Sequence, residues 1–140
     1  MQYINPYEIL NVQAENLSDI DFHFLRKLKR QLIIDIELDH DRFFYHGCEL
    51  SKSACISVLD ELDDENKRRF HFFIYKNRNL NNFLAEGDLA LFEKYRLEEI
   101  YNLPIFVDFI SPYFCERFSA ALLEAFSQDS TSPTFIYIKI

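Results

Sequence analysis

The sequence predicts a mainly α-helical protein, and three observations carry that prediction. Only 2 glycines and 4 prolines occur among 140 residues, which argues against a turn-rich β fold and against a disordered chain. Hydrophobic residues make up 49% of the chain and include 15 phenylalanines, so a sizeable core is available. Several segments repeat apolar residues at spacings of three and four, which is the period of one helix face.

The first expected element is a short helix from Pro6 to about Leu10. Asn5 is a favourable N-cap, and proline suits the first helical position. Glu8 stands three residues after the cap, where its carboxylate supports the helix start.

The second expected helix runs from Asp19 to about Glu37. Ser18 and Asp21 have the spacing of a capping box. One apolar stripe follows at spacings of three and four, formed by Phe22, Leu25, Leu28, Leu32 and Ile36.

Residues 38–50 lack a clean period, and we expect an irregular loop held in place by its aromatic side chains. Ser51 is the expected cap of a third helix. The apolar stripe of this third helix consists of Cys55, Val58, Leu59 and Leu62. We expect this stripe to pack against that of the second helix, so that the two helices form an antiparallel pair.

Acidic residues 63–65 suit the start of a fourth helix that continues to about Tyr75. The polar, asparagine-rich residues 77–82 predict a connection. Asp88 is expected to cap a helix that carries apolar residues as far as Ile100, and Pro104 should end it.

The last part of the chain predicts one more helical segment and a strand. Residues 105–126 are strongly apolar, and Pro112 should kink or divide them. Residues 134–140 alternate like a strand, but no partner strand is evident.

Three segments, in their order and spacing, resemble a J-domain, the co-chaperone module of DnaJ-type proteins. They are the opening residues 5–12, the basic helix around residues 25–32, and residues 59–70 with the sequence LDELDDENKRRF. The resemblance covers about residues 5–73. It implies a J-like antiparallel helical hairpin over residues 5–75. The resemblance does not extend to residues 76–140, and from their apolar pattern we expect a helical extension that packs on the hairpin to form one compact unit.

The resemblance breaks down at the tripeptide on which that family depends. A J-domain places His-Pro-Asp directly after its basic helix, where it stimulates the ATPase of a DnaK-type chaperone. This chain has Glu37, Leu38 and Asp39 in that position. Glutamate removes the imidazole donor and leucine loosens the turn, so ATPase stimulation is not carried over. The resemblance still implies the helical fold and a second helix that binds partners.

The distribution of charge narrows the class of partner. The formal net charge is −8, which disfavours nucleic acid and anionic membranes as partners. We therefore expect another protein, with a DnaK-type chaperone as one candidate. The alternative is that the basic cluster is simply the solvated side of an amphipathic helix. The predicted partner-binding residues are Arg26, Lys27, Lys29, Arg30, Glu37, Leu38 and Asp39.

No catalytic motif is present, and two glycines leave little from which to build a phosphate-binding loop. We therefore expect a non-catalytic protein with no cofactor and no metal. The possible metal ligands that lie closest together in the sequence occupy one loop without a recognisable ligand spacing, and a polar loop is the favoured interpretation. They are Asp39, His40, Asp41, His46 and Cys48.

The cysteines and the N-terminus bear on the compartment. Cys48, Cys55 and Cys115 are an odd number at no useful spacing, which favours reduced thiols over a disulfide framework. No signal peptide pattern is visible, so a cytoplasmic location is expected.

The favoured function is an adaptor or regulatory module. The alternatives are an atypical co-chaperone, a small metal-dependent enzyme using residues 39–48, and an acidic inhibitor that covers a basic partner.

Overall fold

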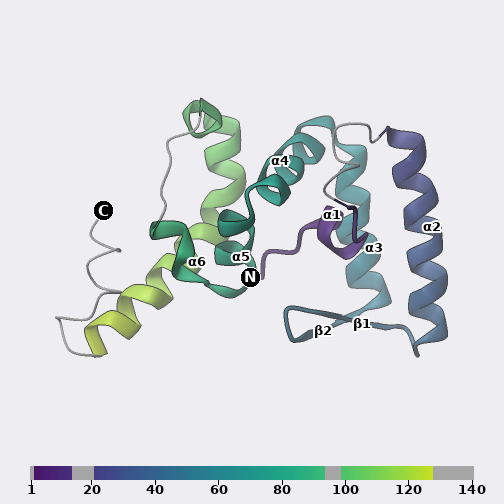
Figure 1. Ribbon diagram of the computed structural model, residues 1–140, viewed down its shortest axis with the longest axis horizontal. Helices are drawn as coiled ribbons and strands as arrows, with labels where there is room; N and C mark the ends of the chain where they lie inside the picture. Colours follow the sequence, from purple (N-terminus) through teal and green to yellow (C-terminus); the bar gives the residue numbers. More distant parts are fainter. Residues whose placement is uncertain (1, 14–20, 94–98, 128–140) are drawn as a thin grey trace. The chain divides into compact units, whose positions relative to one another are not determined.

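The computed structural model describes residues 2–13, 21–93 and 99–127, and over these residues the fold is mainly α, as predicted (Figure 1). The chain divides into two compact units. One is Ile4–Lys76, and the other combines Met1–Tyr3 with Asn77–Ile140 and is called here the C-terminal unit. The expected packing of residues 76–140 on the first module stays a prediction.

The Ile4–Lys76 unit begins with α1, Pro6–Ile9, as the opening residues predict. The Asn5 side chain accepts a hydrogen bond from the backbone N–H of Tyr7 at 3.0 Å, which satisfies one of the donors left open at a helix start. Tyr7 and Ile9 are both buried, so this single turn is fixed by packing rather than by its length.

Helix α2, Phe22–Leu38, and helix α3, Lys52–Asp60, form the predicted antiparallel pair (Figure 1). Two ion pairs establish the direction. Lys29, in the first half of α2, contacts Asp60 at the end of α3, whereas Glu37 at the end of α2 contacts Lys52 at the start of α3.

The start of α2 differs from the expected start at Asp19. Asp21 is itself the N-cap, because its Oδ1 accepts from the backbone N–H of Phe24 at 2.7 Å. Ser18, the expected cap, lies outside the described residues. An aspartate that accepts a hydrogen bond from the backbone N–H three residues later forms a charge-assisted N-cap, and this cap does not require Ser18.

The expectation of an irregular loop over residues 38–50 is wrong. Strands β1, Arg42–Tyr45, and β2, Cys48–Ser51, form an antiparallel hairpin in which Tyr45 faces Cys48. His46 and Gly47 make the two-residue turn, and both have positive φ, 47° and 79°. Such backbone values fit the right-handed twist of paired strands. Tyr45 and Leu50 are buried, which anchors the hairpin to the unit.

Helices α3 and α4 start where the sequence predicts. The Ser51 hydroxyl accepts from Ala54 N–H at 3.1 Å. Asp64 Oδ1 accepts from the N–H groups of Asn66 and Lys67, and α4 follows as Glu65–Lys76. A short 3₁₀ turn, η2 (Glu61–Asp63), joins the two helices. Local capping chemistry is sufficient to position both starts.

The C-terminal unit begins with a correction. Residues 77–82, expected to be a polar connection, belong largely to helix α5, Arg78–Glu86. Leu80, Phe83 and Leu84 form its buried face, and Asn81 is buried with them. The helix ends at Gly87, whose φ of 82° is the left-handed value that glycine adopts readily.

Asp88 caps the next element as predicted, but that element is only a 3₁₀ turn, η3 (Leu89–Phe92). Residues 94–98 lie outside the described residues. A second 3₁₀ turn, η4 (Glu99–Asn102), precedes the last helix, α6, Pro104–Ser127. The predicted terminal strand, residues 134–140, also lies outside the described residues.

Helix α6 continues through Pro112 and changes direction partway along, as the sequence predicts (Figure 1). Next to the proline, the Ser111 hydroxyl donates to the Val107 carbonyl at 2.6 Å. An aromatic cluster holds α6 against α5 and η3. The ring of Phe83 lies 5.1 Å from those of both Phe92 and Phe114, and Phe83 is fully buried.

The three cysteines give a simple test of this packing. Cys48 and Cys115 are exposed, whereas Cys55 is buried in α3, where burial raises the pKa of its thiol. We expect two thiols to react rapidly with a chromogenic disulfide reagent, and the third only after unfolding. If all three thiols reacted at the same rate in the folded protein, the burial of Cys55 in α3 would be contradicted.

Candidate functional site

Three of the four predicted basic residues point away from the fold. Arg26, Lys27 and Arg30 are exposed on α2, and they are called here the basic face. Lys29 is different, because its Nζ lies 2.6 Å from Asp60 Oδ1 and contributes to holding α2 against α3. The structure therefore assigns Lys29 a structural contact and leaves the other three bases on the surface.

Aromatic and cationic side chains fix the beginning of α2. The guanidinium of Arg26 lies 4.6 Å from the centre of the Phe22 ring, and that of Arg68 lies 5.4 Å from the same ring. Arg68 also donates to the Leu62 carbonyl at 2.8 Å. This arrangement connects α2 to the α3–α4 junction and gives the basic face a rigid support.

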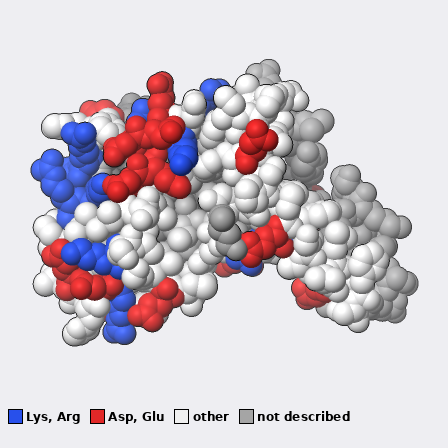
Figure 2. Space-filling model, turned by 180° about the vertical axis from the view of Figure 1, so that it is seen from behind, with Lys and Arg blue, Asp and Glu red and all other residues white. Residues whose placement is uncertain are grey.

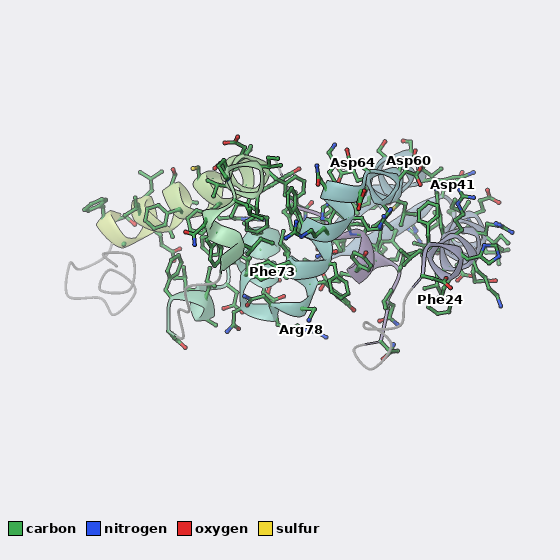
Figure 3. All side chains as sticks on the ribbon, turned by 90° about the horizontal axis from the view of Figure 1, so that it is seen from above. Phe24, Asp41, Asp60, Asp64, Phe73 and Arg78 are labelled. Carbon is green, nitrogen blue, oxygen red and sulfur yellow. The ribbon has the colours of Figure 1, made fainter. Side chains whose placement is uncertain are left out.

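Basic and acidic side chains both gather on the surface of this unit. Figure 2 shows lysine and arginine side chains gathered at one edge of the unit, and a dense group of acidic side chains beside them. Asp60 and Asp64 belong to the α3–α4 junction, and Figure 3 places them on the opposite side of the unit from Phe24. The basic face is thus a local positive region on a chain whose net charge is −8.

Among the described residues, Lys27 and Arg30 have no hydrogen bond or ion pair through their side chains. A surface charge that is not engaged within its own chain can pair with a partner without first breaking an internal contact. Long-range attraction from such residues raises association rates and selects oppositely charged surfaces.

The three residues in the altered tripeptide position have different environments. Glu37 Oε1 lies 2.7 Å from Lys52 Nζ, and this hydrogen bond raises the pKa of Lys52. Leu38 is 80% exposed at the end of α2. Asp39 is exposed at the C-cap, with its Oδ1 3.8 Å from Arg42 Nε. All three side chains are therefore exposed, and Glu37 has a closer cationic neighbour than Asp39 has.

The metal alternative receives no geometric support. In the part of the chain that the structure describes, no three histidine, cysteine, aspartate or glutamate side chains come together as a metal site. His46 Nε2 instead lies 2.8 Å from Glu8 Oε1, and Cys48 is exposed on β2. In the hairpin, His46 therefore contacts Glu8, whereas Cys48 is exposed to solvent.

Sequence reasoning missed a buried polar network behind the helix pair. Asn5 is fully buried, and its Nδ2 donates to the His71 carbonyl at 3.0 Å. The Tyr45 hydroxyl accepts from the Asn5 backbone N–H at 3.2 Å. The His71 ring is also buried and lies 2.6 Å from Glu61 Oε2. The network joins α1, β1 and α4, so it positions the elements that support α2.

His71 makes the stability of this unit depend on pH. Burial lowers the pKa of His71, and Lys67 adds to that effect. Together they outweigh Glu61, whose carboxylate accepts a hydrogen bond from the imidazole and whose negative charge acts in the opposite direction. The unfolded chain therefore takes up a proton near the ordinary histidine pKa of about 6.5, while the folded state resists it. The contribution of neutral His71 to the stability of the folded unit is therefore complete above about pH 6.5, and it is lost as the pH falls below that value.

We expect the urea midpoint of the Ile4–Lys76 unit to fall between about pH 7.5 and pH 5.5, as the linkage between proton binding and folding requires. His71→Gln should reduce this dependence, because glutamine can still donate to Glu61 but does not titrate. A wild-type midpoint that does not change over this range would contradict the neutral, buried state of His71.

The C-terminal unit contains an apolar pocket of about 230 Å³. Leu80, Phe92 and Phe114 contribute to its wall, and the nearby Ser111 hydroxyl already donates to the Val107 carbonyl. Its described lining carries no charged side chain, and its polar groups come from Tyr101 and Ser111.

None of the described helices has the length and apolar character that crossing a bilayer requires. No protein-family model, curated protein or solved structure matches this chain. Three of the residues predicted to bind a partner, Arg26, Lys27 and Arg30, lie exposed on α2.

Proposed function

We propose that this chain is a non-catalytic interaction or regulatory module that binds another protein through the basic face of α2. The main supporting observation is that only some charged side chains of α2 form ion pairs with α3. Lys29 and Glu37 are paired with α3, whereas Lys27 and Arg30, on the same helix, are exposed and unpaired within the described residues. The surface favours an acidic partner because the two bases stand together on one rigid helix.

The packing behind α2 supports the proposal. Ion pairs at both ends of the α2–α3 pair, together with the Phe22 contacts, hold the basic face in one geometry before binding. A preorganised surface loses less conformational entropy when a partner binds. The antiparallel pair supports the proposal of a J-like scaffold, and the three free thiols support a cytoplasmic location.

Affinity capture with two matched variants tests the proposal. Lys27→Glu/Arg30→Glu reverses two exposed bases on α2, and Lys67→Glu/Arg69→Glu reverses two exposed bases on α4. Both variants change the net charge equally. We expect a specific protein to be recovered by the wild type and the α4 variant, and to be lost with the α2 variant. Equal recovery by all three proteins would overturn the proposal.

An atypical co-chaperone is the second candidate, and the exposure of Asp39 directly after α2 favours it. Hydrolysis of ATP by a DnaK-type chaperone, measured with and without this chain, separates the two candidates. Stimulation that disappears in Asp39→Asn would support the co-chaperone candidate. An unchanged rate would leave the adaptor proposal and remove this one.

A further inference from the structure

The exposed face of α2 carries a regular stripe of residues. Phe24, Lys27, Gln31, Ile34 and Leu38 follow one another at spacings of three, four, three and four. This stripe, called here the outer stripe, lies opposite the buried positions Leu25 and Ile36. A three–four alternation is the spacing with which one helix packs along another in a left-handed coiled coil.

Large apolar side chains on the outer stripe are exposed. Phe24 is 40% exposed, Ile34 is 50% exposed and Leu38 is 80% exposed. Ile34 and Leu38 are four residues apart and therefore lie side by side on the helix surface. A single exposed leucine is ordinary, but apolar residues arranged on one helical stripe form a surface that a second helix can cover.

After the exposed Phe24 in its first turn, the surface of α2 changes along the helix axis from basic to apolar. Arg26, Lys27 and Arg30 occupy the first half, whereas Ile34 and Leu38 occupy the second. Two exposed carboxylates, Asp35 and Asp39, border the apolar end. A complementary partner therefore carries acidic residues opposite the first half and apolar residues opposite the second, because like charges placed together would be repulsive.

We infer that the outer stripe binds an amphipathic helix of a partner protein, with an acidic end and an apolar end. This inference rests on the proposed function and specifies the class of partner. From Phe24 to Leu38 the stripe spans about 21 Å, so the bound segment is a helix of about four turns. The apolar anchors contribute affinity, and the acidic end fixes the direction in which the helix lies.

An anionic membrane is a poorer fit to the same surface. Helices that lie on membranes separate apolar and basic residues around their circumference, so that all apolar residues enter the lipid together. Here the separation runs along the axis, and Asp35 and Asp39 flank the apolar end, where anionic lipid would repel them.

A binding assay with defined peptides tests the inference on the full chain. The probe is a fluorescent, hydrocarbon-stapled helix of about 18 residues, with glutamates in one half and leucines at coiled-coil spacing in the other. Two matched peptides replace either the glutamates with glutamine or the leucines with serine. Vesicles containing phosphatidylserine form the lipid arm, and fluorescence anisotropy gives the peptide affinities.

We expect the acidic, leucine-containing peptide to bind at least about tenfold more tightly than either matched peptide, and vesicles not to bind. Ile34→Ser/Leu38→Ser and Lys27→Glu/Arg30→Glu should each weaken the peptide by a similar factor, whereas Lys67→Glu/Arg69→Glu should not.

Two results would overturn the inference. One is binding that depends on Lys27 and Arg30 but not on Ile34 and Leu38, which would leave the proposed function intact. The other is vesicle binding lost in the same variants, which would replace a helical protein partner with lipid.

Discussion

Asn5→Ala is expected to destabilise the Ile4–Lys76 unit by about 3 kcal/mol, of which the lost helix cap contributes about 1 kcal/mol and the stranded buried carbonyl the rest. The Asn5 side chain caps α1 and donates to the His71 carbonyl, and no part of it reaches solvent. Alanine cannot make either bond, and water cannot reach the site to replace them.

Asp21→Ala provides the control for this prediction. Asp21 caps α2 in the same manner, through a hydrogen bond to Phe24 N–H, but it is exposed. Its loss should cost only about 1 kcal/mol, the usual contribution of a cap. Urea unfolding followed by far-ultraviolet circular dichroism measures both variants. Equal losses would show that the buried bond to His71 contributes nothing.

Phe83→Ala is expected to destabilise the C-terminal unit by about 4 kcal/mol, a typical cost for emptying a fully buried phenylalanine site. Phe83 lies between Phe92 and Phe114, with ring centres 5.1 Å apart in each case. Its removal opens a cavity among α5, η3 and α6. Amide hydrogen exchange is the suitable measurement, because protection in α5 and α6 reports on this unit separately.

Leu123→Ala is the matched comparison within the same unit. Leu123 is also a large apolar residue, but it is 71% exposed on α6. Alanine is a favourable helix residue, so protection should change by no more than about 0.5 kcal/mol. If both variants lost protection equally, Phe83 would not be the centre of this core.

Much of the first unit could be predicted because its signals are local. Ser51 and Asp64 each accept hydrogen bonds from residues two or three positions later, and such contacts depend on no distant part of the chain. The helix pair follows from apolar stripes, whose period of three and four is visible in the sequence. Composition and this apolar spacing together were sufficient for the fold class.

The errors arose where tertiary packing decides between conformations. The hairpin turn is His46–Gly47 rather than the usual asparagine–glycine, so its signal is weak. Helix α5 contains several asparagines, which have poor helix propensity. It is helical because Leu80, Phe83 and Leu84 bury one face, and this gain exceeds the cost of the asparagines.

The candidate surface could be predicted only in outline. The basic residues and their helix are evident from the sequence, but which of them face α3 depends on the register of two packed helices. Lys29 and Glu37 are paired because Asp60 and Lys52 lie opposite them. The exposure of Ile34 also requires knowledge of that register, since its position differs from the buried Ile36 by only two residues.

Lysine acetylation of the free chain and of its complex with the captured partner tests the central claim most directly. Lys27 belongs to the basic face, whereas Lys67 is an exposed lysine on α4 in the same unit. Mass spectrometry reports the modification of each residue separately. If the basic face binds the partner, acetylation of Lys27 falls several-fold in the complex and that of Lys67 does not change. Protection of Lys67 with Lys27 still fully reactive would contradict the account.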